Sequence, residues 1–239
     1  FVCINKMNKY FIKYLLKKFI SKKQRSKLLA LKKFLIYKYR KYILIYAVNT
    51  NKKDINIILG AALTNQKNWF SSNEQWLDIS NRSHWEKIFK SKQIINNAVA
   101  EHVFEHLTRR ETIKALKLIY GALKPKGNLR IAVPDGNNPN HEYIKNVGIK
   151  GIGADAQDHK QLLNYEEIKE LMENTGFKVT LKEGYKSDGE LIANFIDPIK
   201  GHILRSRSNH KINKLKQSKI AGWNYPDSIS SLIVDGEKV

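Results

Sequence analysis

From about residue 54 onward, short apolar runs rich in β-branched residues alternate with stretches of helical periodicity. Apolar runs of this kind, bounded by glycine or proline, are typical of buried strands whose two faces are both covered. Strands that alternate with helices predict an α/β fold built on one sheet. The seven candidate strands are 54–60, 68–72, 76–80, 93–100, 128–134, 177–185 and 230–239.

Two helices between these strands begin with recognisable capping sequences. Thr108 with Glu111, and Asn164 with Glu167, have the spacing of a capping box, in which two residues exchange side-chain-to-backbone hydrogen bonds. Gly176 is expected to end the second helix. The side chains expected to face the core are Ile113, Leu116, Tyr120 and Leu123 in the first helix and Ile168, Leu171 and Met172 in the second.

The beginning of the chain differs from the rest in charge. Residues 1–53 contain 16 Lys or Arg and no Asp or Glu, and the whole chain has a net charge of +21. Phe11 and Leu15 recur at helical spacing among these lysines, which predicts a basic amphipathic helical arm followed by a domain at 54–239. Such a helix suits an anionic membrane surface, so peripheral membrane contact is expected through residues 1–50. The alternative is that these helices pack on the domain with their lysines in water.

Composition limits the remaining classes. The chain of 239 residues has no apolar run near the roughly 18 residues of a membrane span, and no secretory signal is evident. Its single cysteine, Cys3, excludes a disulfide framework and is compatible with a reducing cytoplasm, so a cytoplasmic location is expected. No nucleic-acid-binding motif is present, and nucleic acid is not expected as a partner.

Three segments, in this order, resemble the class I S-adenosylmethionine-dependent methyltransferases with a type 11-like domain. They are ILGAAL at 58–63, AEHVFEHL at 100–107 and LKPKGNLRIAVPD at 123–135. The resemblance implies a doubly wound, Rossmann-like sheet of seven strands, mostly parallel with an antiparallel last strand, and S-adenosyl-L-methionine as the cofactor. It implies methyl transfer to an acceptor that the sequence does not identify, and it suggests a small molecule or a cell-surface sugar.

The resemblance also assigns cofactor-binding roles by position. Gly60, with Ala61 beside it, falls where a glycine-rich loop lets the backbone approach the cofactor, and a helix following it would offer its N-terminus to the methionine carboxylate. Only Gly60 remains of the family's glycine cluster, which leaves open a catalytically degenerate binding or scaffold protein recruited to a membrane by its arm. The other residues expected at the cofactor are Asn73 and Glu74 at the ribose, Asp78 at the adenine, and Ala100 and Glu101 after the fourth strand.

Catalytic groups are expected beyond the fifth strand, because ligands of α/β sheets bind at the carboxyl ends of the strands. His159 is the candidate base and Asp135 the carboxylate that orients it, and the glycine-rich stretch 148–153 is a candidate lid. Arg205 or Arg207 would suit an anionic acceptor. The alternative is that these are turn, cap and surface residues.

AEHVFEHL also contains the inverted zinc-peptidase pattern, His102-x-x-Glu105-His106. Two histidines at i and i+4 share one helical face and can bind zinc, with Glu105 as the base and Glu183 as a distant third ligand. In this chain, however, the pattern follows a buried strand and precedes the capping box at Thr108, so it does not lie in the long helix of those peptidases. No metal is therefore expected.

Overall fold

Contacts between Cα atoms divide the chain into two units, residues 1–42 and residues 43–239. Helix α2 (Lys22–Asn49) continues from the first unit into the second, where Leu44 and Val48 are fully buried. The second unit therefore begins within this helix, before the boundary expected after residue 53. No helix of the described residues combines the length and apolarity needed to cross a membrane. The computed structural model describes residues 21–153, 155–207 and 231–239.

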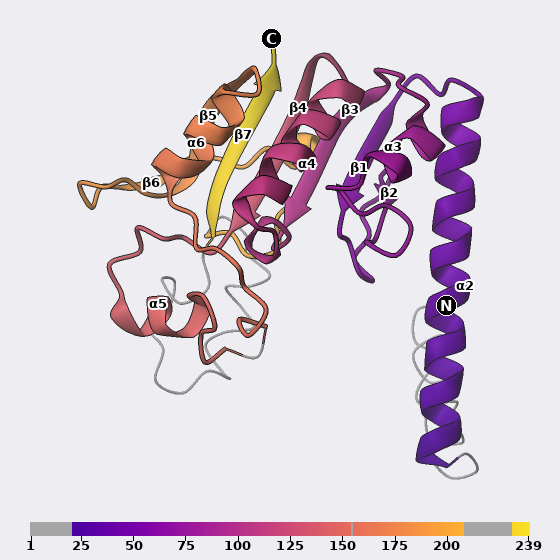
Figure 1. Cartoon of the computed structure of the whole chain (residues 1–239), viewed down its shortest axis with the longest axis horizontal. Coiled ribbons are helices and arrows are strands. Elements are labelled where there is room, and N and C mark those ends of the chain that lie inside the picture. Colours follow the sequence, from indigo (N-terminus) through magenta and orange to yellow (C-terminus); the bar gives the residue numbers. More distant parts are fainter. Residues whose placement is uncertain (1–20, 154, 208–230) are drawn as a thin grey trace, which may run out of the picture. The chain divides into compact units, whose positions relative to one another are not determined.

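Seven strands form one mixed sheet in the order β2-β1-β3-β4-β7-β5-β6 (Figure 1). The first four strands in this order are parallel to one another, whereas β7 is antiparallel to both of its neighbours and β6 is antiparallel to β5. This confirms the Rossmann-like fold with an antiparallel last strand. The strands are β1 Ile55–Leu59, β2 Phe70–Ser71, β3 Ile95–Glu101, β4 Leu123–Val133, β5 Phe177–Tyr185, β6 Leu191–Ala193 and β7 Leu232–Lys238.

One expected strand, at 76–80, is wrong. Its residues form turns, in which Asp78 accepts hydrogen bonds from the backbone and hydroxyl of Ser80, and the carbonyl of Ile79 accepts one from the indole of Trp85. These local bonds satisfy the backbone of the apolar run without a neighbouring strand. The seventh strand is β6, which pairs with the end of β5.

The two capping boxes are confirmed: Thr108 with Glu111 caps α4, and Asn164 with Glu167 caps α6. The expected core face of α6 is confirmed, but that of α4 is partly wrong, because Ile113 is 37% exposed. The buried residues of α4 are Thr112, Ala115, Leu116, Ile119 and Ala122. The helices of this unit are α3 Arg82–Phe89, α4 Arg109–Ala122, α5 His141–Val147 and α6 Tyr165–Glu173, with 3-10 turns η1 Phe104–His106 and η2 Pro198–Lys200.

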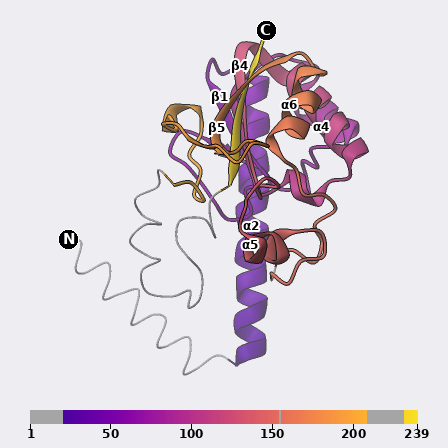
Figure 2. The ribbon, with the colours of Figure 1, turned by 90° about the vertical axis from the view of Figure 1, so that its left-hand side faces the viewer.

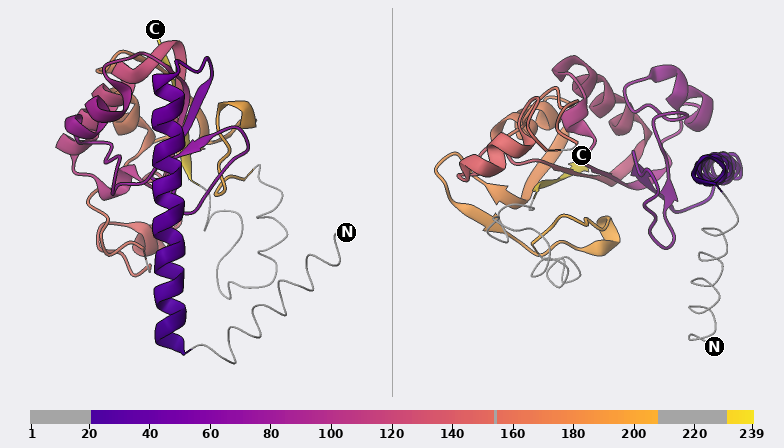
Figure 3. Two further views of the ribbon diagram at one scale, coloured as in Figure 1. Left: turned by 90° about the vertical axis from the view of Figure 1, so that its right-hand side faces the viewer. Right: turned by 90° about the horizontal axis from the view of Figure 1, so that it is seen from below.

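The two faces of the sheet are covered differently. Helices α4 and α6 lie on one face, and the segment between β6 and residue 203, which contains η2, lies on the other (Figures 2 and 3). On this second face Ile196 and Ile203 pack into one apolar cluster with sheet residues that include Val99 and Ala132. In the described part of the chain, an irregular segment takes the place of a helical layer here.

A buried ion pair fixes this segment to the sheet. Arg130 on β4 is fully buried, and its Nε and Nη2 atoms lie 2.7 and 2.8 Å from the carboxylate of Asp235, its cross-strand partner on β7. Its Nη1 donates to the carbonyl oxygens of Asp197, at 2.7 Å, and Gly201. One guanidinium therefore joins two strands and the irregular segment.

The Asp235→Asn variant is expected to lower the free energy of unfolding by about 3–5 kcal/mol, because it leaves the buried Arg130 without its countercharge. Urea denaturation monitored by circular dichroism measures this change. The control is Glu173→Gln, which breaks the exposed Lys169–Glu173 pair and should cost less than about 1 kcal/mol. If both variants lowered the free energy of unfolding by the same amount, the result would show that the buried pair does not hold the segment.

Candidate active site at the carboxyl ends of the strands

Gly60 follows β1 and has a positive φ of 62°. A Cβ atom at this position would lie 2.6 Å from Cγ2 of Val103, so only glycine fits. Ala61 is buried, and its backbone N–H donates to the carbonyl of Ser72 after β2. The helix expected after Gly60 is wrong, because residues 60–69 form turns joined by irregular backbone. The short connection ends in the polar run TNQKN, which has no apolar face to pack as a helix.

Asn73, the expected ribose residue, lies just beyond β2. Only 6% of it is exposed, and neither the oxygen nor the nitrogen of its side-chain amide has a hydrogen-bond partner. A buried amide without partners costs free energy, and native proteins rarely tolerate one. The side chain therefore has hydrogen-bonding capacity at the carboxyl end of β2 that no described residue uses.

The other expected cofactor residues have mixed surroundings. Glu74 is exposed and Ala100 is fully buried within β3. Asp78 is half-buried, and its carboxylate is engaged with Ser80 in the turn after β2. Asn73 is thus the member of this set that combines burial with unused polar atoms.

Glu101 ends β3 and already has partners from the distant segment. Its two carboxylate oxygens accept the backbone N–H groups of Leu204, at 3.0 Å, and Arg205, at 2.7 Å. These bonds hold residues 204–205 across the end of β3. Both oxygens of Glu101 are therefore engaged, and they hold Arg205, which lines the cavity described below.

Asp135, the expected orienting carboxylate, is buried beyond β4. Its oxygens accept the backbone N–H groups of Asn137, at 3.0 Å, and Tyr185, at 2.8 Å. Burial raises the pKa of the Asp135 carboxyl to about 6, although these two hydrogen bonds oppose the shift. Through Tyr185, the side chain ties the end of β4 to the end of β5.

His159, the expected base, lies in the loop between α5 and α6. Its Nδ1 is 2.7 Å from the carbonyl oxygen of Val147. A carbonyl only accepts, so Nδ1 carries a proton, and Nε2 is the ring nitrogen left to act as an acceptor. None of the hydrogen bonds described for the two residues joins His159 to Asp135. The structure therefore does not form the expected base–carboxylate pair.

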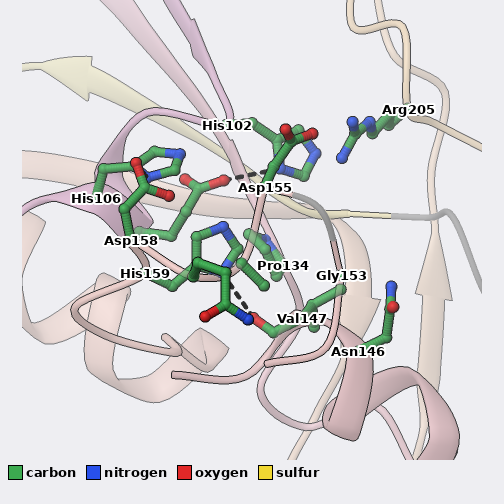
Figure 4. Close-up of a pocket in the computed structure, with 13 residues that line it drawn as sticks. His102, His106, Pro134, Asn146, Val147, Gly153, Asp155, Asp158, His159 and Arg205 are labelled. Atoms are coloured by element: carbon green, nitrogen blue, oxygen red, sulfur yellow. Dashed lines mark hydrogen bonds and ion pairs between the residues drawn. The ribbon is translucent and has the colours of Figure 1, made fainter. Parts of the chain in front are cut away.

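A cavity of about 570 Å³ opens beyond the ends of β3 and β4 (Figure 4). Its wall includes Arg205, one of the two arginines considered for an anionic acceptor. The backbone N–H of the other, Arg207, donates to Glu183, and its guanidinium lies over the ring of Tyr185. The volume and the polar wall suit a small hydrophilic molecule. The ionisable groups that line it are His102, Glu105, His106, Asp155, Asp158, His159 and Arg205.

The structure brings Glu105, His106 and His159 together, an association that the sequence does not predict. One ligand atom from each of the three lies within 4.8 Å of the others. Glu183, the residue considered as a distant third zinc ligand, is not among them. Its carboxylate accepts bonds from Ser206 and Arg207. The sequence shows the first two as neighbours, but it contains no signal that the loop returns His159 to them.

Similarity to solved structures is broad in extent and low in identity. A methyltransferase of Archaeoglobus fulgidus described as SAM-dependent aligns over 84% of this chain and 94% of its own, with 15% identity and a TM-score of 0.44. A possible histamine N-methyltransferase of Thermotoga maritima aligns over 90% and 97%, with 16% identity and a TM-score of 0.42. The 1,6-didemethyltoxoflavin-N1-methyltransferase of Burkholderia thailandensis aligns over 96% and 89%, with 11% identity and a TM-score of 0.42.

No curated protein matches the sequence. The family model described as "Methyltransferase domain" matches residues 33–182, more than half of the chain. That span contains Gly60, Asn73, Glu101 and the cavity residues up to His159. The chain belongs to the S-adenosylmethionine-dependent methyltransferases, with the class I sheet described above.

Proposed function

We propose that the protein transfers a methyl group from S-adenosylmethionine to a small polar acceptor, such as a sugar, held in the cavity beyond β3 and β4. The observation that carries this proposal is the buried, unpartnered amide of Asn73, which follows Ser72, the residue whose carbonyl accepts the N–H of Ala61. An amide both donates and accepts, so it can pair with a ribose hydroxyl. When bound, the cofactor supplies an electrophilic methyl group on its sulfonium.

Positioning is the main contribution expected from the chain. Methyl transfer is an in-line displacement, so holding donor and acceptor in register supplies much of the rate enhancement. The loop after Gly60 offers no helix N-terminus, so binding at this edge depends more heavily on Asn73. Glu101 holds residues 204–205 through its two bonds, and this helps to position Arg205 at the acceptor cavity.

The cavity favours a hydrophilic acceptor. Three histidines and Arg205 line it, together with carboxylates at Asp155 and Asp158. Such a wall can pair with hydroxyl or anionic groups, which an apolar acceptor lacks. Of the expected catalytic pair, His159 lines this space, whereas both oxygens of Asp135 bind the backbone.

The Asn73→Leu variant is expected to bind S-adenosylhomocysteine about tenfold more weakly, because it loses the hydrogen bonds of the amide. Isothermal titration calorimetry of the full chain measures this change. The unliganded variant should be as stable as the wild type or more stable, since leucine leaves no buried polar atom unpaired.

The matched control is Asn128→Leu, because Asn128 on β4 is also buried and its amide also has no partner. This variant should keep the wild-type affinity. If millimolar S-adenosylhomocysteine produced no binding heat and no thermal shift, this result would contradict the enzyme proposal. That result would favour the alternative, a Rossmann-like scaffold protein that has lost its cofactor.

Asp135 is expected to make stability depend on pH. Its folded-state pKa of about 6 lies above the ordinary value of 3.8, so the folded state binds the proton more tightly than the unfolded state. Its stabilising contribution is therefore complete below about pH 4 and is lost as the pH rises through 6. Between pH 4 and 7, the unfolding free energy of the wild type should fall by about 2–3 kcal/mol relative to Asp135→Asn. Parallel pH profiles for the two proteins would contradict this.

We further propose that the arm contacts an anionic membrane surface. Residues 1–53 carry 16 basic and no acidic residues, whereas the remainder has 27 basic and 22 acidic residues. On the described part of the arm, α2 exposes large apolar and aromatic side chains between its lysines: Leu28, Leu29, Leu31, Phe34, Leu35, Tyr39 and Tyr42. Lysines attract the anionic headgroups, and aromatic rings favour the membrane interface.

Replacing Lys32 and Lys33 by glutamine should weaken binding to phosphatidylserine-containing vesicles at least about tenfold, because each lysine near such a surface contributes about 1 kcal/mol. Vesicle co-sedimentation at two salt concentrations measures this effect, and high salt should weaken wild-type binding. The control replaces Lys114 and Lys117, exposed on α4, and should bind as the wild type does. Equal losses for both pairs would indicate that net charge alone is responsible.

A further inference from the structure

We propose that Glu105, His106 and His159 form a binding site for a divalent transition-metal ion of the zinc type. One ligand atom from each residue lies within 4.8 Å of the others, at the wall of the cavity (Figure 4). Two imidazoles and one carboxylate form a donor set that suits zinc, iron, cobalt or nickel, and is less suited to magnesium or calcium. Metal binding at these residues is independent of the proposed methyl transfer.

The first support is the unused bonding capacity at the centre of the cluster. Glu105 is 1% exposed, and its Oε2 has no hydrogen-bond partner. Nδ1 of His106 is also buried without such a partner. A buried carboxylate oxygen and a buried imidazole nitrogen without partners are costly, and a shared cation would satisfy both.

The second support is the set of bonds that orient the three side chains. The proton on Nδ1 of His159 points to the carbonyl of Val147, which leaves Nε2 as a ligand atom. The other carboxylate oxygen of Glu105 accepts a bond from Nδ1 of His102 at 2.8 Å, and Nε2 of His102 lies 3.1 Å from the hydroxyl of Ser231. Metal ligands in proteins are usually oriented by outer partners of this kind.

The third support is the way the backbone holds the two parts of the site together. The N–H groups of Lys160 and Gln161 donate to the carbonyl of Glu105, at 2.8 and 3.3 Å. The amide of Gln161 adds bonds to the carbonyl of Phe104 and the hydroxyl of Thr112. Residues 104–106 and 159–161 are therefore clamped together by bonds that do not involve the ligand atoms.

To bind a zinc ion, the three ligand atoms need to move only slightly closer together. Zinc–nitrogen bonds of about 2.0–2.1 Å place tetrahedral ligand atoms about 3.4 Å apart, so the cluster would contract by about 1 Å or slightly more. Rotation of His106 can supply much of this, because its side chain is 32% exposed. Three protein ligands leave at least one coordination position open for a water molecule or an oxygen of the acceptor, and the latter role rests on the proposed function.

Asp158 offers a competing explanation. Its Oδ2 lies 3.2 Å from Nδ1 of His106, without hydrogen-bonding orientation, and its side chain is 74% exposed. A protonated His106 paired with Asp158 would leave His159 and Glu105 as independent polar residues. In that case removing His159 would not change metal affinity.

The test uses the full chain without an affinity tag, treated with chelator and titrated with Zn²⁺ by calorimetry and with Co²⁺ by absorption spectroscopy. The expected result is one equivalent of each metal and a visible Co²⁺ band of low-coordinate nitrogen and oxygen ligation. His159→Gln and His106→Gln each remove a ligand, so each should weaken metal binding by at least the roughly tenfold to hundredfold that loss of a ligand's outer partner costs. Zn²⁺ should also raise the melting temperature of the wild type and not that of these variants.

His141→Gln is the matched control, because His141 is exposed at the start of α5 and should not affect binding. His106 is less buried than Glu105, so its variant is expected to fold, and circular dichroism verifies this. Absence of saturable binding by the wild type, or equal affinity in His159→Gln and His141→Gln, would overturn the proposal. Neither assay includes cofactor or acceptor, so the result is separate from the calorimetry with S-adenosylhomocysteine.

Discussion

The bidentate pair between Arg130 and Asp235 is the interaction on which the arrangement of the sheet's second face depends. A guanidinium with no exposure to water is stable only when its donors are satisfied, and here Asp235 and two backbone carbonyls do so. Those carbonyls belong to the segment after β6, so the guanidinium that pairs with Asp235 also holds this segment on the sheet. Residues 204–205, which bind Glu101, lie a few positions farther along the same segment.

The loop after β1, where the cofactor site is proposed, contacts the same segment through the bonds of Gln66 with Pro198 and His202. The connection after β1 is too short and too polar for a helix, and the irregular segment packs Ile196 and Ile203 against the sheet instead. Gly60 still has the backbone conformation expected of a close-approach position, but contact with Val103 alone is sufficient to require glycine there. The glycine is therefore weaker support for a cofactor than Asn73, whose unpartnered amide no contact within the described chain explains.

The parts of the structure that the sequence predicts correctly are those determined by neighbouring residues. The capping boxes at Thr108 and Asn164 depend on residues three positions apart, and the parallel strands on continuous apolar runs. The run at 76–80 has the same composition as a strand, and it forms turns because the side chains of Asp78 and Trp85 satisfy its backbone locally. The tertiary contacts of His159 and Asp135 are set by a long loop, and no local pattern records that one binds the carbonyl of Val147 and the other the backbone of Tyr185.

The segment AEHVFEHL shows how fold context changes the chemistry of one pattern. In a long helix, the two histidines of His102-x-x-Glu105-His106 bind one metal and Glu105 acts as a base. Here the segment begins in β3 and only Phe104–His106 form a 3-10 turn, and His102 binds Glu105. The glutamate is then oriented by one histidine and lies beside the other, so it is placed as a ligand and not as a base. The third ligand comes from the loop after α5 and not from Glu183, since a doubly wound sheet gathers loops at the carboxyl ends of its strands. The same geometry places the metal candidate and the acceptor cavity on a common wall, which the zinc-peptidase pattern alone does not imply.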